Sequence, residues 1–388
     1  MELKGLKITI IGSGIGGLTA AVALRRLGAS VTVLEQASAI TEVGAGLQIS
    51  PNGVAVLRAL DLADDLAWCS QRARAVVLRS HRRGAEVLRL DLDQYAAGLP
   101  YYMVHRSDLI GLLAAAARRA GVQVRLLQKV ERVEVGARTV VHLGNGAQCG
   151  GDVVIGADGL HSKMRTALNG GDQPFFTGQV AWRATVPNHL NLPPETQVFM
   201  GPRRHLVAYP LRDGRLVNLV AVQARRSWAE EGWQFRDDPA NLRAAFAGFG
   251  GAAAALLEAV DEVMLWGLFR HPVAECWHRG NAAIVGDAAH PTLPFMAQGA
   301  NLALEDAWVL ARSLAEAPGV ESGLAMYQQR RRDRAEKVVR TASRNAWKYH
   351  LRAPLNWPAH QVLKLAGRFA PERMVRQFDW IYRHDVTA

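Results

Sequence analysis

The chain has 388 residues, of which 49% are hydrophobic and 21% charged, a composition typical of a soluble globular protein that can hold two packed domains. Each long apolar run is broken by glycine or charge, so no membrane span is expected. Residues 8–24 resemble a signal-peptide core but lack a small-residue cleavage site, and we therefore reject export. The net charge of +11 comes mainly from arginines spread along the chain. That spread argues against a nucleic-acid groove and suits an anionic substrate and cofactor.

The three cysteines lie far apart in the sequence, at Cys69, Cys149 and Cys276. No pair of cysteines and no cysteine–histidine cluster has metal-ligand spacing, so neither a metal site nor a disulfide framework is expected. A cytoplasmic location follows as the expectation. The densest arginine run, residues 330–334, is expected to be a solvated surface.

The N-terminal segment predicts a βαβ unit. Residues 7–11 form a β-rich run, residues 12–17 a glycine-rich turn, and residues 18–27 an apolar helix that ends at Gly28. Residues 31–34 then predict a second strand. A helix over 52–60 follows, and after it a strand pair within 75–90.

Helix and strand signals continue to residue 155. Residues 108–120 predict a helix with Ser107 as its N-cap and Gly121 as its stop. Residues 122–127, 130–135 and 139–143 predict strands, with a hairpin turn at 144–146. Residues 152–155 predict a buried strand.

From residue 178 the pattern changes to a period of two, which indicates a separate antiparallel sheet. The expected strands are 179–186, 197–200, 205–211 and 216–223, with a hairpin turn at 212–214. A helical stretch over 240–260, a buried strand over 282–285 and a long helix over 299–315 follow. An arginine-rich helical tail begins at residue 323.

The first turn carries the pattern G-x-G-x-x-G. Gly12 allows the tight turn, Gly14 lets the backbone approach a pyrophosphate, and Gly17 lets helix and strand pack closely. The helix that follows offers unpaired N–H groups and a partial positive charge to phosphates. Glu35 ends the second strand, where an acid binds ribose hydroxyls. Together these residues predict a dinucleotide, without distinguishing NAD from FAD.

Two later segments distinguish them. Residues 154–165 (Val-Ile-Gly-Ala-Asp-Gly-Leu-His-Ser-Lys-Met-Arg) and 284–291 (Ile-Val-Gly-Asp-Ala-Ala-His-Pro) resemble the paired motifs of the class A flavoprotein aromatic hydroxylases. That group contains salicylate hydroxylase and 3-hydroxybenzoate 6-hydroxylase. Residues 44–52, Trp182-Arg183 and residues 378–382 extend the resemblance over nearly the whole chain. It implies tightly bound, noncovalent FAD.

The resemblance assigns cofactor contacts residue by residue. Arg106 should face the FAD phosphates, Asp158 the inner part of the cofactor and the NAD(P)H path, and Asp287 the ribityl chain. The alternative for Asp158 and Asp287 is simple turn formation beside glycine. His290 is expected to shape its loop rather than to act in catalysis. The same resemblance adds a set of further cofactor contacts: Gln48, Gly286, Pro294, Gly299, Ala300 and Asn301.

The helix that begins near Gly299 is expected to point at the flavin, because a helix N-terminus stabilises the anionic reduced ring. The resemblance places Gln298 over the substrate as a catalytic residue; the alternative is that Gln298 only caps the helix. In a branch acting on hydroxynicotinate, a histidine replaces the residue that corresponds to Gln48. Its absence here disfavours that substrate.

On the substrate side, His205 and Tyr209 share one face of a predicted strand. Related phenol-acid hydroxylases carry His and Tyr at this spacing. Forming a phenolate at pH 7 costs about 4 kcal/mol, and a pocket imidazole can take the proton. The alternative is that His205 is exposed or makes its hydrogen bonds within the protein core and takes no part in catalysis. Arg203 and Arg204 are candidates to hold a substrate carboxylate, or are an exposed pair.

We therefore expect an α/β fold like that of para-hydroxybenzoate hydroxylase. A Rossmann-like FAD-binding domain (residues 1–74, 101–170 and 276–322) would carry an inserted antiparallel β-sheet substrate domain (75–100 and 171–275). A C-terminal helical segment (323–388) would follow, and a homodimer through it stays open.

The expected activity is hydroxylation of a small aromatic acid, salicylate- or 3-hydroxybenzoate-like, with NADH or NADPH and O2, through a flavin C4a-hydroperoxide. The alternatives are a larger aromatic metabolite, a hydroxypyridine carboxylate, an FAD oxidase or dehydrogenase on the same fold, and a non-catalytic nucleotide-binding protein.

Overall fold

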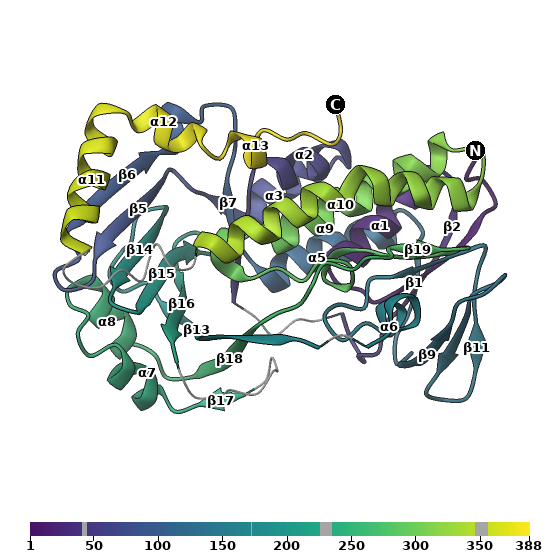
Figure 1. The fold of residues 1–388 in the computed structure, drawn as a ribbon, viewed down its shortest axis with the longest axis horizontal. Helices are drawn as coiled ribbons and strands as arrows, with labels where there is room; N and C mark the ends of the chain where they lie inside the picture. The colour runs from purple at the N-terminus through teal and green to yellow at the C-terminus, as the bar shows by residue number, and fades with distance from the viewer. Residues whose placement is uncertain (41–44, 172, 226–234, 346–355) are drawn as a thin grey trace.

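A six-stranded, mainly parallel sheet forms the first half of the architecture. The structure is a computed structural model that describes residues 1–40, 45–171, 173–225, 235–345 and 356–388 (Figure 1). Gly44, the first residue of the 44–52 motif, lies outside these ranges. The strand order is β19 (His278–Arg279), β20 (Ala282–Ile284), β12 (Val153–Gly156), β1 (Lys7–Ile11), β2 (Ser30–Leu34) and β8 (Gln123–Arg125). All neighbours are parallel except β19 and β20.

Buried aliphatic side chains pack this sheet against α1 (Ile15–Arg26), α5 (Arg106–Arg119) and α9 (Gly299–Glu316). Helix α1 contacts both α5 and α9. A small sheet of β11 (Gln148–Cys149), β10 (Val140–Leu143) and β9 (Val130–Glu134) lies beside α6 (Lys163–Asn169). The expected α/β fold is confirmed in this half.

The second half is an eight-stranded sheet drawn from residues 75–91 and 175–270. Its order is β17 (Arg236–Asp237), β18 (Val263–Arg270), β13 (Phe175–Pro187), β16 (Leu216–Ala224), β15 (Arg204–Leu211), β14 (Glu195–Gly201), β5 (Ala75–Ser80) and β6 (Glu86–Asp91). Only β14 and β5 run parallel. Trp182, Phe199 and Leu206 form a core with Leu242 of α7 (Pro239–Ala245) and Leu256 of α8 (Ala252–Glu258).

A short antiparallel sheet, β3 (Gly46–Ile49), β7 (Tyr102–His105) and β4 (Ser70–Arg72), lies between the two larger ones and was not predicted. It holds the 46–49 segment above β15 and β16, where the backbone N–H of Gly46 donates to Asn218 Oδ1 at 2.6 Å. The short helices of this region are α2 (Pro51–Ala59), α3 (Ala63–Cys69) and α4 (Leu92–Tyr95).

The C-terminal helices wrap around the outside of both halves. Helix α10 (Val320–Asn345) lies along α9, and α11 (Asn356–Phe369) packs on β6 (Figure 1). The chain then passes through α12 (Pro371–Arg376) to α13 (Asp379–Tyr382). The division into domains by residue number stays a prediction.

Two local predictions need correction. Helix α5 begins at Arg106, two residues earlier than expected, because the ring of His105 rather than the side chain of Ser107 accepts the capping hydrogen bond, from the backbone N–H of Ser107. The helical stretch over 240–260 is two helices, since the backbone at Gly251 has a φ of 61° and cannot continue a helix. Strand β18, which pairs with β13, was also missed.

Candidate active site

One cavity of about 410 Å³ lies where the two large sheets meet. It receives the N-termini of α1 and α9, the β3 segment, one face of the eight-stranded sheet and the loop 291–297. Two helix N-termini give it a positive potential that suits an anion. Of the predicted site residues, those lining it are Gly14, Gln48, Arg106, His205, Tyr209, Gly286, Asp287, Pro294, Gly299 and Ala300.

The glycine turn has the shape that a dinucleotide needs. Gly12 has a φ of +99°, and a Cβ there would overlap the carbonyl of Ala157. A Cβ on Gly17 would overlap the carbonyl oxygen of Gly12. Gly14 differs, because it lines the cavity and a Cβ there would meet no protein atom within 4 Å. Gly12 and Gly17 are therefore required by the fold, whereas Gly14 faces open space in the cavity.

Glu35 lies at the end of β2, as predicted, and reaches back to the glycine turn. Its carboxylate accepts hydrogen bonds from the backbone N–H of Ser13 at 3.0 Å and from the Ser13 hydroxyl at 2.6 Å. A third bond comes from the backbone N–H of Ala37. Glu35 thus holds the turn, and its contact with a ribose stays a prediction.

A carboxylate, Asp287, and a guanidinium, Arg106, line the same cavity and attract each other. The Asp287 side chain is exposed to the cavity, yet the surrounding protein excludes enough water to raise its pKa; Arg106 and His290 oppose that rise. Burial lowers the pKa of Arg106, while the charge of Asp287 acts in the other direction. This arrangement can bind a polar chain and a phosphate group.

Asp158 is used by the fold instead. Its carboxylate accepts from the Ser162 hydroxyl and from the backbone N–H groups of Lys163 and Met164, at the start of α6. It does not line the cavity, although Ala157 and Gly159 do. The alternative weighed for Asp158, a turn role, agrees with these hydrogen bonds, and its contact with the cofactor stays a prediction.

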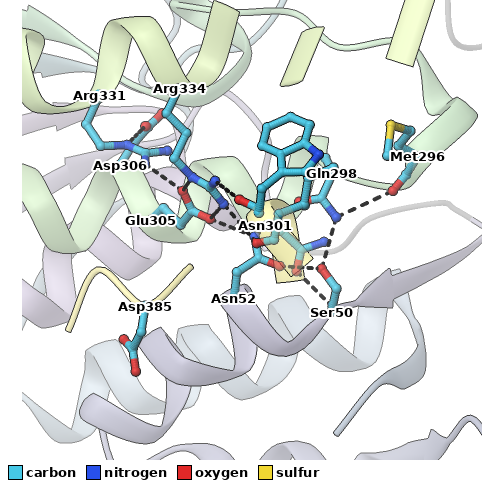
Figure 2. Close-up of polar contacts among 12 residues, drawn as sticks. Ser50, Asn52, Met296, Gln298, Asn301, Glu305, Asp306, Arg331, Arg334 and Asp385 are labelled. Carbon is cyan, nitrogen blue, oxygen red and sulfur yellow. Dashed lines mark hydrogen bonds and ion pairs between the residues drawn. The ribbon is translucent and has the colours of Figure 1, made fainter. Parts of the chain in front are cut away.

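Gln298 also has a structural position: it does not line the cavity, and its place over the substrate stays a prediction. Its side-chain oxygen accepts from Asn52 at 3.1 Å, and its nitrogen donates to the Ser50 hydroxyl at 3.0 Å (Figure 2). The side chain is fully buried and makes no capping bond to α9. Asn301 likewise accepts from the backbone N–H of Ser50 and donates to the carbonyl oxygen of Gln48, which fixes β3; its contact with the cofactor stays a prediction.

Two arginines of the run on α10, Arg331 and Arg334, do not belong to a solvated surface. Arg331 is 1% exposed and donates to Glu305 at 2.6 Å and to Asp306 at 2.8 Å (Figure 2). Arg334 donates to Glu305 and to the carbonyl oxygens of residues 380 and 381. Asp306 also contacts His290, which is buried and has the loop-shaping role expected for it. These ion pairs tie α9 and the loop of η1 (Gly286–Ala288) to α10 and the C-terminal segment.

The face of β15 that meets the cavity carries the predicted substrate residues. His205, Val207 and Tyr209 all line it, while Leu206 and Ala208 point into the core under α7 and α8. His205 is 3% exposed and its ring centroid lies 6.1 Å from that of Phe295 in the 291–297 loop. The shared face predicted from strand periodicity is therefore confirmed.

Tyr209 lies at the end of the cavity bounded by the 46–49 segment. Burial raises its pKa well above the usual value, despite opposing effects of Arg183 and of a hydrogen bond with Gln48. Gln48 also accepts a 2.6 Å hydrogen bond from the hydroxyl of Tyr101. Tyr209 is thus a neutral hydrogen-bonding group at physiological pH.

The arginines considered for a substrate carboxylate lie elsewhere. Arg203 and Arg204 sit at the turn between β14 and β15 and do not line the cavity. The Arg204 guanidinium lies over the ring of Phe246, on the opposite face of the sheet. The cavity instead contains Arg183, whose guanidinium lies 4.5 Å from the ring centroid of Trp266. Arg183 belongs to the quoted Trp-Arg pair but had no assigned role.

Within the described part of the chain, no helix is long and apolar enough to cross a membrane. The same residues contain no group of three or more His, Cys, Asp or Glu side chains that could hold a metal ion.

Comparisons with known proteins agree with the site. A family described as an FAD binding domain matches residues 6–342. The chain is 36% identical to 3-amino-4-hydroxybenzoate 2-monooxygenase of Streptomyces cremeus over 90% of this chain and 89% of that one. It is 34% identical to 6-hydroxynicotinate 3-monooxygenase of Bordetella bronchiseptica (88% and 91% covered). It is 32% identical to salicylate hydroxylase of Pseudomonas putida (98% and 93%).

Among solved structures, Klebsiella pneumoniae HpxO complexed with FAD and uric acid superposes with a TM-score of 0.84 at 27% identity, covering 96% of this chain and 95% of that one. The para-hydroxybenzoate hydroxylase-like fold is thereby confirmed. Enzymes of this group use NAD(P)H and O2 as co-substrates. The chain belongs to the FAD-binding-domain family of class A flavoprotein aromatic hydroxylases and is an FAD-dependent monooxygenase.

Proposed function

We propose that this monooxygenase uses NADH or NADPH and O2 to hydroxylate a small aromatic ring that carries a hydroxyl group and a carboxylate. The observation that carries the proposal is a buried histidine, His205, on the same cavity face as Tyr209. The relatives named above act, by their names, on 3-amino-4-hydroxybenzoate, 6-hydroxynicotinate and salicylate. Each of those compounds is a hydroxylated aromatic or pyridine ring with a carboxylate.

The residues that surround the cavity fit FAD. The open space at Gly14 and the N-terminus of α1 suit the pyrophosphate, with Arg106 as a counter-charge. Asp287 suits the ribityl hydroxyls, and the N-terminus of α9 at Gly299 and Ala300 suits the pyrimidine end of the ring. When bound, FAD supplies hydride acceptance from NAD(P)H and transfer of one oxygen atom from O2 to the substrate.

The role proposed for His205 is to accept the proton of the substrate hydroxyl. Deprotonation makes the ring electron-rich, and without a base it costs about 4 kcal/mol at pH 7 for a phenol with a pKa near 10. Tyr209, which stays protonated, can donate a hydrogen bond to a substrate oxygen. Phe295 and the valines of the sheet face exclude water around the reacting ring.

The names of the relatives favour a small substrate, because each acts by its name on an acid with a single ring. A hydroxypyridine carboxylate stays the second candidate, because the Bordetella relative is named for one. The glutamine at position 48, which hydrogen-bonds with Tyr101, argues for a benzene ring.

The test begins with the FAD-loaded enzyme. Hydroxybenzoates and hydroxypyridine carboxylates are screened for stimulated oxidation of NADH and NADPH, and the products are weighed by mass spectrometry for a gain of oxygen, with or without loss of CO2. One or more hydroxylated acids should give a coupled product. Protein without affinity for FAD, or NAD(P)H oxidation that yields only hydrogen peroxide with every acid, would contradict the proposal.

A further inference from the structure

We propose that Arg183 is the carboxylate-binding residue of the substrate site, and that it makes the enzyme selective for anionic aromatic acids over neutral phenols. This inference rests on the proposed function and assigns a residue to its substrate. Arg183 projects from β13 into the cavity that also contains His205 and Tyr209.

The sheet register places Arg183 across the cavity floor from the two β15 residues. Arg183 pairs with Val220 on β16, and Val220 pairs with Val207 on β15, midway between His205 and Tyr209. Strands β13 and β15 are two strand spacings apart, about 10 Å. Val207 and Val220 give an apolar floor between the guanidinium and the β15 side chains. One substituted benzene ring can lie on that floor with its hydroxyl toward β15 and its carboxylate toward β13.

The chain does not neutralise Arg183. No carboxylate of the described residues pairs with it, and its Nε lies buried with no hydrogen-bond partner among them. The nearby ionisable groups are Tyr209, which is neutral, and Arg106, which repels it. Burial lowers the pKa of Arg183 to about 10, so the side chain stays cationic at neutral pH. An enclosed cation that lacks an anionic partner is costly to the fold, and an anionic ligand reduces that cost.

The orientation of the guanidinium also suits a carboxylate. It stacks on the indole of Trp266 from the neighbouring strand β18, which fixes its plane and adds a favourable cation–π contact. A fixed planar guanidinium presents two parallel N–H groups that match the two oxygens of a carboxylate. The neighbouring Trp182 points into the core behind the sheet, so in the Trp-Arg pair Trp182 packs the core and Arg183 faces the cavity.

The experiment measures binding without turnover. FAD-loaded enzyme, without NAD(P)H, is titrated with the three monohydroxybenzoates and with their matching carboxamides, and the flavin absorbance reports binding. We expect at least one acid to bind roughly 10- to 100-fold more tightly than its amide, the range for a hydrogen bond between charged groups. In Arg183→Gln this preference should fall to within about threefold, chiefly by weaker binding of the acid. Arg183→Lys should keep an intermediate preference, because it retains the charge and loses the fork.

Arg204→Gln is the matched control, since Arg204 is on the same sheet but outside the cavity, and it should keep the parent's preference. FAD content and melting temperature are measured for every variant. The inference is overturned if the parent does not prefer acids, if Arg183→Gln and Arg183→Lys both keep the parent's preference, or if Arg183→Gln chiefly loses FAD, which would assign Arg183 to the cofactor. Because the binding assay needs no turnover, a parent enzyme that prefers acids but never hydroxylates them would contradict the proposed function and leave the role of Arg183 in binding intact.

Discussion

Two glycines of the same turn should respond differently to the same added methyl group. At Gly14 the backbone is extended, with φ −72° and ψ −176°, and a Cβ meets no protein atom within 4 Å. Gly14→Ala should therefore change the stability of the FAD-free protein by less than about 1 kcal/mol, the scale of a helix N-cap change. At Gly17 the new Cβ would overlap the carbonyl oxygen of Gly12, so the turn must shift. We expect Gly17→Ala to cost about 1–3 kcal/mol in the FAD-free protein.

For FAD binding, we expect Gly14→Ala to have the larger effect of the two substitutions. The methyl group of Gly14→Ala occupies the space left beside the backbone N–H groups at the start of α1. Losing one hydrogen bond to a charged phosphate should weaken FAD binding by roughly 10- to 100-fold. Stability is measured by urea unfolding after FAD removal, and affinity by quenching of FAD fluorescence. If Gly14→Ala bound FAD with the parent's affinity, or destabilised the FAD-free protein as much as Gly17→Ala, the assignment of that space to a ligand would be wrong.

Three further predictions address the substrate face and the ion pairs. His205→Ala should slow hydroxylation by about 10²- to 10⁴-fold at pH 7, with a smaller deficit toward pH 10 where the phenol ionises unaided; equal product rates at pH 7 would remove His205 from the chemistry. In Gly46→Ala the new Cβ would lie 2.7 Å from Tyr209 Cε2 and 2.9 Å from its hydroxyl, so substrate KM should rise several-fold while FAD affinity holds. Unchanged KM would show that Tyr209 does not touch substrate. Although burial alone would raise it, attraction to His290 and Arg331 holds the pKa of Asp306 down to about 2, against an ordinary 3.8. Its carboxylate therefore stabilises the fold fully above pH 3.8 and loses this effect as the pH falls toward 2. Asp306→Asn should lower the free energy of unfolding in urea by about 2 kcal/mol at pH 7, and by progressively less below about pH 4. A loss of stability that is the same at neutral and acidic pH would contradict this.

Sequence reasoning succeeded where the signal is local. The βαβ unit, the turn glycines and the shared face of His205 and Tyr209 all follow from spacing along one element. The three glycine motifs, residues 12–17, 154–165 and 284–291, indicated the family through their order along the chain. Arg165 shows why the second and third motifs occur together. Its guanidinium donates to the carbonyl oxygens of Ala288 and Ala289 in the third motif.

Sequence reasoning did not find hydrogen-bond and ion-pair partners that lie far along the chain. Gln298 and Asn301 bind residues of the 48–52 segment, and that contact depends on a three-stranded sheet whose strands are too short to carry a clear period. Arg331 was predicted to be on the surface because its acidic partners, Glu305 and Asp306, are on another helix. Arg183 did have a signal: it is the lone charged residue in the run 179–186, at the position alternating with core-facing Trp182.

The strand order of the parallel sheet has a consequence for folding during synthesis. Strand β1 is made first, but its partner β12 ends at Gly156, and the next strand, β20, ends at Ile284. By then every strand of the eight-stranded sheet has been made. The inserted sheet can therefore fold while an edge of the surrounding sheet is still unpaired, and a nascent chain exposes that edge to association with other chains.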